Sequence, residues 1–260
     1  LDIQPQSSRE VTLPISWPTS GEALMSFIFT TRSDQPWAKA GHTAAWDQLA
    51  GPIAAPAKIT HLPSSQVQLV EDSTQATLTL GQRRVVIDKA QGQLTAYSDG
   101  EHELIMRGPQ LNLWRGPTDN DALQLIFGRP DRALGLWQRL GLEHIQRRLE
   151  GLRVVTAEDG GPAIEVTHAL SGRDQWEDVR HTHTYALLDD GTLRIDSYVR
   201  VAPELIDLPR VGLELQLSPE LEQLAWYGRG PVDNYNDRKA GTEIGLFESS
   251  ITEQYVPYIM

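Results

Sequence analysis

The chain contains 260 residues, of which 40% are hydrophobic and 22% are charged, as in ordinary globular proteins. This composition excludes a disordered chain, because enough apolar surface is present to offset the entropy of ordering the backbone. No apolar run approaches the roughly 20 residues of a membrane-spanning helix, which excludes an integral membrane protein, and the acidic balance argues against an anionic membrane as a partner. The formal net charge of -12 argues against nucleic acid as a partner, since proteins that bind nucleic acid usually carry clusters of Lys and Arg.

The absence of cysteine excludes a disulfide framework, a thiolate metal site and a cysteine nucleophile. No signal-like segment is visible at the start, which favours a cytoplasmic protein. The chain begins at Leu1 and ends in an uncharged aromatic stretch, residues 255–260, whereas natural termini are usually exposed and polar. We therefore expect a piece cut from a longer polypeptide.

Residues 51–65 include three prolines among small residues and are predicted to be an extended linker between two modules. Residues 1–50 are too few for a whole β-sandwich, so we interpret them as the later part of one. Residues 66–260 form the second module, and the excess of acidic residues belongs to it.

Short β-prone segments separated by polar or Gly-containing turns predict strands along the whole chain. The expected strands cover residues 11–16, 22–32, 67–71, 76–80, 83–88, 94–97, 103–106, 111–114, 152–156, 163–170, 180–187, 192–201, 210–217 and 224–227. Residues 132–141 place three leucines and Trp137 at helical spacing. The pattern predicts an all-β protein, a large antiparallel β-sandwich with one short helix.

The first candidate site is the loop from Arg115 to Asp121, which follows an apolar strand. Its carboxylate and amide groups, Asp119, Asn120 and Asp121, could bond sugar hydroxyls or bind a cation. They could equally form a turn in which Asp and Asn cap their own backbone and Arg115 pairs with a carboxylate. Composition alone favours the turn.

The second candidate lies in residues 226–238, where Trp and Tyr stand beside Asn, Asp and Arg. Aromatic faces next to such polar groups are typical of carbohydrate sites. The alternative is a structural corner held by pairing between Arg and Asp, and composition again favours it. The residues that would build either arrangement are Arg229, Asn234, Asp237 and Arg238.

His181 and His183 share one face of a predicted strand and could be a pair of metal ligands. The sequence offers no apparent third ligand, so an exposed strand face is the favoured interpretation. The chain also has no phosphate-binding glycine loop, no nucleophile elbow and no His-Glu-x-x-His motif. Pairs of carboxylates are numerous, and the sequence alone does not show which two stand at the separation that a glycosidase needs.

Four segments, spaced in order along the chain, resemble the C-terminal part of large bacterial β-galactosidases of glycoside hydrolase family 2. They are residues 38–46, 113–121, 228–238 and 255–260. In the third segment the family more often has Glu where this chain has Asp233. A likeness that runs through essentially the whole chain is far more specific than any single loop.

The resemblance implies that residues 1–50 end an immunoglobulin-like domain. Residues 66–260 would then be the larger part of a galactose-mutarotase-like sandwich, the β-galactosidase small chain or fifth domain, truncated at its C-terminus. The implied reaction is retaining hydrolysis of terminal β-D-galactosides such as lactose, with one Glu as acid and base and another as nucleophile. Those glutamates belong to a barrel upstream of Leu1, as do the main ligands of the Mg2+ and Na+ that family members use. We therefore expect no metal bound by this chain.

The resemblance also implies a supporting role for the two candidate sites. In the family, a loop at the mouth of the active site follows the first motif, and here it would run from Ala122 towards Arg132. The residues expected to hold its base are Arg115, Asp119, Asn120 and Asp121, and those expected to brace the sandwich are Arg229, Asn234, Asp237 and Arg238.

The implied partners are a β-galactoside substrate, the rest of the β-galactosidase chain and further copies in a homo-oligomer. Two other functions stay open from the sequence. One is a carbohydrate-binding β-sandwich module without chemistry. The other is an epimerase-like enzyme that would use His181 and His183.

Overall fold

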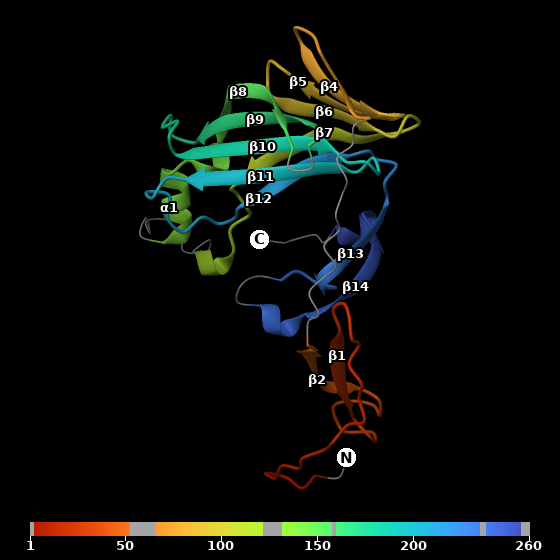
Figure 1. Cartoon of the computed structure of the whole chain (residues 1–260). Helices are drawn as coiled ribbons and strands as arrows, with labels where there is room; N and C mark the ends of the chain where they lie inside the picture. The colour runs from red at the N-terminus through yellow and green to blue at the C-terminus, as the bar shows by residue number, and fades with distance from the viewer. Residues whose placement is uncertain (1–2, 53–65, 122–131, 158–159, 235–237, 256–260) are drawn as a thin grey trace. The chain divides into compact units, whose positions relative to one another are not determined.

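The computed structural model describes residues 3–52, 66–121, 132–157, 160–234 and 238–255 (Figure 1). The chain divides into two compact units. Unit 1 consists of Leu1–Ile59 together with Gln223–Met260, and unit 2 consists of Thr60–Glu222. No helix among the described residues is both long enough and apolar enough to span a membrane.

The first sheet of unit 2 has six strands in the order β12-β7-β6-β5-β4-β3, and every neighbouring pair is antiparallel. Ala76 and Leu78 of β4 are fully buried, whereas the threonines between and beside them face outward, because side chains alternate across a strand. The six strands are β3 (Gln68–Glu71), β4 (Gln75–Leu80), β5 (Arg83–Asp88), β6 (Gln93–Ser98), β7 (Glu103–Asn112) and β12 (Gly212–Leu217).

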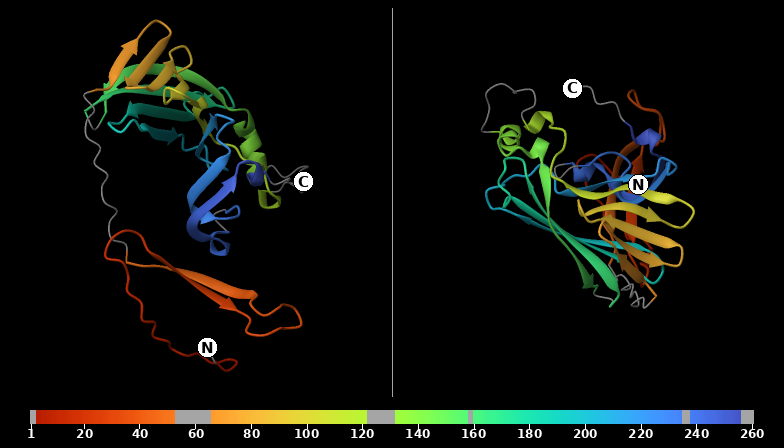
Figure 2. Two further views of the ribbon diagram at one scale, coloured as in Figure 1. Left: turned by 90° about the vertical axis from the view of Figure 1, so that its right-hand side faces the viewer. Right: turned by 90° about the horizontal axis from the view of Figure 1, so that it is seen from above.

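The second sheet of unit 2 has four antiparallel strands in the order β11-β10-β9-β8. They are β8 (Gln146–Thr156), β9 (Pro162–Ser171), β10 (Val179–Leu187) and β11 (Leu193–Val201). The two sheets face each other (Figure 2) and share one core, in which Ile87 and Leu94 of the first sheet pack with Val166 and Tyr185 of the second. Unit 2 is therefore a β-sandwich.

One end of the sandwich is closed by the helix α1 (Ala133–Arg139), with η1 (Asp119–Asp121) and η2 (Leu142–His144) close to it in sequence. Leu134 and Trp137 of the helix join a second core cluster with Leu113 and Val179. At Gly141, which follows the helix with φ +66°, a Cβ atom would lie 2.1 Å from the carbonyl oxygen of Gly172. This close backbone approach requires glycine.

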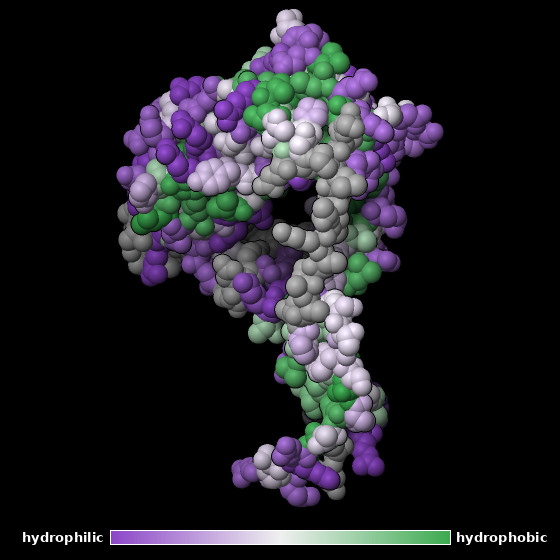
Figure 3. Space-filling model, in the orientation of Figure 1, coloured by the Kyte–Doolittle hydropathy of each residue, from purple (hydrophilic) through white to green (hydrophobic). Residues whose placement is uncertain are grey.

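Unit 1 contains two hairpins, β1 (Leu24–Thr30) with β2 (Thr43–Ala50) and β13 (Gln223–Gly230) with β14 (Glu243–Ser250), as well as η3 (Lys239–Gly241) and η4 (Thr252–Gln254). The side chain of Gln48 donates to the carbonyl oxygen of Ile244 and accepts from its N–H, both at 2.9 Å, as a neighbouring strand would. The first hairpin exposes large apolar side chains, including Ile28 and Leu49. Hydrophobic residues, drawn in green, lie at the molecular surface in several places (Figure 3).

The predicted all-β sandwich is confirmed, with 49% of the described residues in strands and 8% in helices. The helix predicted at residues 132–141 is α1, and the strand predicted at residues 83–88 is β5. The strands predicted at residues 103–106 and 111–114 are one continuous strand, β7, and β2 and β14 had not been predicted.

Residues 11–16 are not a strand, so that prediction was wrong. Pro14 lies within the segment and has no N–H to donate to a ladder. The linker predicted at residues 51–65 lies outside the described residues beyond Pro52, and the predicted domain limits stay a prediction.

Candidate functional site

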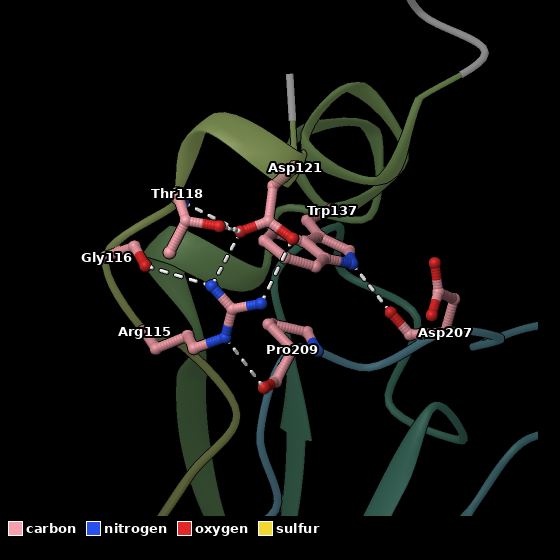
Figure 4. A network of polar contacts seen from close by, with 7 residues as sticks. All are labelled: Arg115, Gly116, Thr118, Asp121, Trp137, Asp207 and Pro209. Carbon is pink, nitrogen blue, oxygen red and sulfur yellow. Dashed lines mark hydrogen bonds and ion pairs between the residues drawn. The ribbon is translucent and has the colours of Figure 1, made fainter. Parts of the chain in front are cut away.

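The first candidate loop is closed by an ion pair between its two ends, Arg115 and Asp121 (Figure 4). The Nη1 and Nη2 atoms of Arg115 lie 2.7 and 3.0 Å from the two carboxylate oxygens of Asp121, which is the bidentate geometry of a strong Arg–carboxylate contact. The guanidinium also donates through Nε to the carbonyl oxygen of Pro209 at 3.2 Å. Arg115 therefore ties the loop to a distant segment of unit 2.

Asp121 also caps the turn from within. It is buried and accepts hydrogen bonds from the N–H and the hydroxyl of Thr118, at 2.8 and 3.0 Å. Burial by itself would raise the pKa of this carboxyl group, but the hydrogen bonds from Arg115 and Thr118 outweigh burial and hold the pKa below its ordinary value. Asp121 is thus a fixed carboxylate whose oxygens are already engaged.

Trp137 of α1 connects this loop to the helix. The guanidinium of Arg115 lies 5.0 Å from the centre of the Trp137 ring, and the indole N–H donates to the carbonyl oxygen of Asp207 at 2.6 Å. The ring of Trp114 meets the same indole edge to face at 6.0 Å. Aromatic and cation–π contacts of this kind stabilise a packed corner.

The structure therefore brings Arg115 and Asp121 together, while Asn120 is exposed. The side chain of Asp119 and residues 122–131 lie outside the part of the chain that the structure describes. Since Arg115 and Asp121 satisfy each other, the arrangement can position the ends of the loop, and the carboxylate of Asp121 is engaged in holding it.

In the second candidate segment, Arg229 holds the connection between β13 and β14. Its Nη1 donates to the carbonyl oxygens of Lys239 and Thr242, at 2.7 and 2.9 Å, across the turn that joins β13 to β14. Trp226 packs on Phe247, with ring centres 5.4 Å apart. Asn234 and Arg238 are exposed, and Asp237 lies outside the described residues.

The interpretation of His181 and His183 as an exposed strand face was wrong, because both side chains are 1% exposed. They point into the sandwich from β10, where their ring centres lie 3.7 Å apart. His168 of β9 is a third buried histidine that sequence reasoning missed, although it pairs directly with His181 in the hairpin register. The burial of His181 and His183 could have been predicted from the alternation of β10, because the apolar Val179 and Tyr185 lie on the same face of the strand as the two histidines.

All three histidines are held neutral. Burial, reinforced by neighbouring positive charge, lowers the pKa of His181 to about 4 and that of His183 to about 3. The pKa of His168 is also lowered, mainly by burial, and its Nε2 lies 2.8 Å from the carbonyl oxygen of Gln91. Within the described ranges, no three His, Asp or Glu side chains are grouped so that they could hold a metal ion.

Two family models match the chain. One, described as beta galactosidase small chain, matches residues 79–260, and the other, described as beta-galactosidase domain 4, matches residues 1–52. The chain belongs to the β-galactosidase small chain family. The resemblance expected from the four sequence segments is thereby confirmed.

Curated relatives of this family member are named beta-galactosidases. Those of Psychromonas ingrahamii, Vibrio cholerae and Priestia megaterium are 29%, 28% and 27% identical to it. Each match covers 100% of this chain but only 26%, 25% and 24% of the relative. The chain thus spans about a quarter of the length of these relatives, and both of its candidate loops fall in the stretch matched by the small-chain model.

Proposed function

We propose that this chain is part of a β-galactosidase that hydrolyses terminal β-D-galactosides, such as lactose, with retention of configuration. In this proposal the catalytic glutamates lie upstream of Leu1, and the chain scaffolds the enzyme and shapes the mouth of its active site. The observation that carries the proposal is the pair of family matches, which follow each other in order over residues 1–52 and 79–260.

The geometry of the first loop supports the role at the mouth. The residues on both sides of the segment 122–131 are anchored in one cluster, with Asp121 bonded to Arg115 on one side and Trp137 of α1 beneath Arg115 on the other. These anchored flanking residues support the proposed position of the loop base at the mouth of the active site.

Mg2+ and Na+ belong to the proposal for the whole enzyme, together with a homo-oligomeric state and a cytoplasmic location. No grouping of His, Asp and Glu suited to a cation is found where the structure describes the chain, so no step is assigned to a metal held here. The burial of His181 and His183 removes support from an epimerase-like reaction, because a substrate cannot reach rings that are 1% exposed.

The proposal is tested by hydrolysis of a chromogenic β-galactoside. The chain is assayed alone and after mixing with a purified upstream portion that carries the barrel, supplied with the C-terminal tail and Mg2+, and the matching α-galactoside is the control substrate. We expect no activity from either piece alone and β-specific activity on mixing. Activity of the chain alone would overturn the placement of the catalytic glutamates, and no activity after the mixed pieces form a stable complex would overturn the proposed function.

A further inference from the structure

The outward face of the four-stranded sheet of unit 2 is hollowed into a groove of about 790 Å3. Ligand pockets in proteins commonly enclose about 300 to 1,000 Å3. The groove is lined by side chains of β8, β9, β10 and β11, and these are the face opposite to the buried histidines. We refer to it below as the β8–β11 groove.

The strand register explains why this face is hollow. Gly151, Thr167, Thr182 and Tyr198 lie opposite one another and form a row across the four strands. The row is low in its first three positions, because Gly151 has no side chain and threonine is short. A Cβ atom built at Gly151 would meet nothing within 4 Å, so the space above β8 is open.

Ion pairs between longer side chains stand on both sides of this row. Arg153 lies opposite Glu165, and its Nε is 2.7 Å from the Glu165 carboxylate. On the other side, the Nε of Arg180 is 2.8 Å from the carboxylate of Glu150. The short, uncharged side chains of the middle row thus lie between two rows of longer, ion-paired side chains. Together the three rows form a trough that runs across the strands.

The middle row offers hydroxyl groups and one aromatic ring. The Oγ1 atoms of Thr167 and Thr182 lie 3.1 Å apart, so one hydroxyl donates to the other while the acceptor's own proton and further lone pairs stay available. Tyr198 ends the row on the edge strand β11 with a side chain that is 69% exposed. Its ring supplies an apolar face and its hydroxyl a polar tip.

We propose that the β8–β11 groove binds a neutral oligosaccharide that lies across the strands. The paired guanidinium and carboxylate groups of the walls can exchange hydrogen bonds with neighbouring sugar hydroxyls, and the ring of Tyr198 receives the apolar face of one sugar. A polyanion is disfavoured, because the acids lining the groove, Glu150, Glu165 and Asp196, outnumber the bases, Arg153 and Arg180.

A protein partner fits this groove less well than a carbohydrate. Protein interfaces have an apolar core depleted of charged residues, whereas charged and hydroxyl side chains line most of the β8–β11 groove. The proposal goes beyond the catalytic function proposed above, since binding in this groove requires no residue outside the 260-residue chain.

The test measures the binding of β-1,4-linked galactotetraose and, as an uncharged comparison, cellotetraose to the 260-residue chain by isothermal titration calorimetry. Gly151→Val fills the β8 end of the trough, where an added Cβ atom meets nothing within 4 Å, and Tyr198→Ala removes the aromatic platform. The matched controls are Gly116→Val, where a Cβ atom also meets nothing within 4 Å, and Tyr255→Ala, which removes another highly exposed tyrosine ring elsewhere. Circular dichroism spectra show whether each variant keeps its strands.

We expect at least one tetrasaccharide to bind the wild-type chain, and Tyr198→Ala to raise its Kd about tenfold, as loss of an aromatic stacking contact and its buried area does. Gly151→Val should weaken binding by a similar or larger factor, and neither control should change the Kd. Binding that survives both groove variants would place the sugar elsewhere. No binding of either tetrasaccharide by a folded wild-type chain would also overturn the proposal.

Discussion

Acidification from pH 7 to pH 5 should destabilise the chain through its buried histidines. His181 and His183 are neutral in the folded state, with pKa values of about 4 and about 3, whereas an unfolded histidine titrates near pH 6.5. Between pH 6.5 and the folded pKa, each of these histidines is protonated in the unfolded state but stays neutral in the folded state. The stability that these residues confer is therefore complete above pH 6.5 and is lost as the pH falls towards about 4.

The size of the loss at pH 5 depends only on the unfolded pKa, because pH 5 lies above both folded values. From pH 6.5 down to pH 5, a span of about 1.5 units, each histidine is protonated only in the unfolded state. At about 1.4 kcal/mol per pH unit, the free energy of unfolding falls by about 2 kcal/mol for each histidine, or by about 4 kcal/mol for the pair. His168, whose pKa is also lowered, adds to the loss in the same direction.

Burial is the main cause of the lowered pKa of both rings, followed by the charge of the neighbouring histidines. Arg147 of β8 lowers the pKa of His181 and His183 by its positive charge, and Tyr185 of β10 stacks on His183 with ring centres 5.6 Å apart. Ser197 of β11 approaches His183 Nδ1 at 3.4 Å. None of these neighbours is a carboxylate that could stabilise an imidazolium, so protonation in the folded state stays costly.

The assay is urea unfolding of the 260-residue chain, followed by tryptophan fluorescence at pH 7 and at pH 5. In the variant His181→Leu, the loss between the two pH values should shrink by about 2 kcal/mol, whatever the variant's stability at pH 7. His144→Gln, which replaces an exposed histidine, is the control for the loss of a histidine outside the core. The reduction of the net negative charge on acidification is shared by all three proteins and cancels in the comparison. An equal loss in wild type and His181→Leu would refute the reasoning.

Two further predictions concern the corner around the first loop. Asp121→Asn replaces one carboxylate oxygen with an amide N–H2 that cannot accept a hydrogen bond from Arg115. The free energy of unfolding, measured by urea titration, should therefore fall by about 2 kcal/mol. An unchanged value would mean that the ion pair does not stabilise the fold. Gly141→Ala adds a Cβ 2.1 Å from the carbonyl oxygen of Gly172 at φ +66° and should cost about 2 kcal/mol or more. Its matched control, Gly116→Ala, meets nothing within 4 Å and should melt within about 2 °C of wild type, whereas equal melting temperatures for both variants would contradict the argument.

The local pattern of apolar and polar residues predicted the strands of the sandwich, because a strand with one buried face has apolar residues at alternate positions. β5, predicted at residues 83–88, begins and ends where the pattern does. β2 was not predicted from its sequence, and the structure defines it by its pairing with β1. The ion pair between Arg115 and Asp121 was within reach because both residues belong to one short motif, whereas the contact of Gln48 with Ile244 joins residues far apart in the chain.

The face of β10 shows how one register decides two properties of the molecule. Val179, Tyr185 and Leu187 are apolar and share their parity with His181 and His183, so burying the apolar residues buries the histidines with them. The same parity sends Arg180, Thr182 and Thr184 outward, where they line the β8–β11 groove. A shift of one residue would exchange the two sets, placing an arginine in the core and imidazoles on the surface. The acid sensitivity of the core and the polar groove on the opposite face therefore follow from one alternation in the sequence.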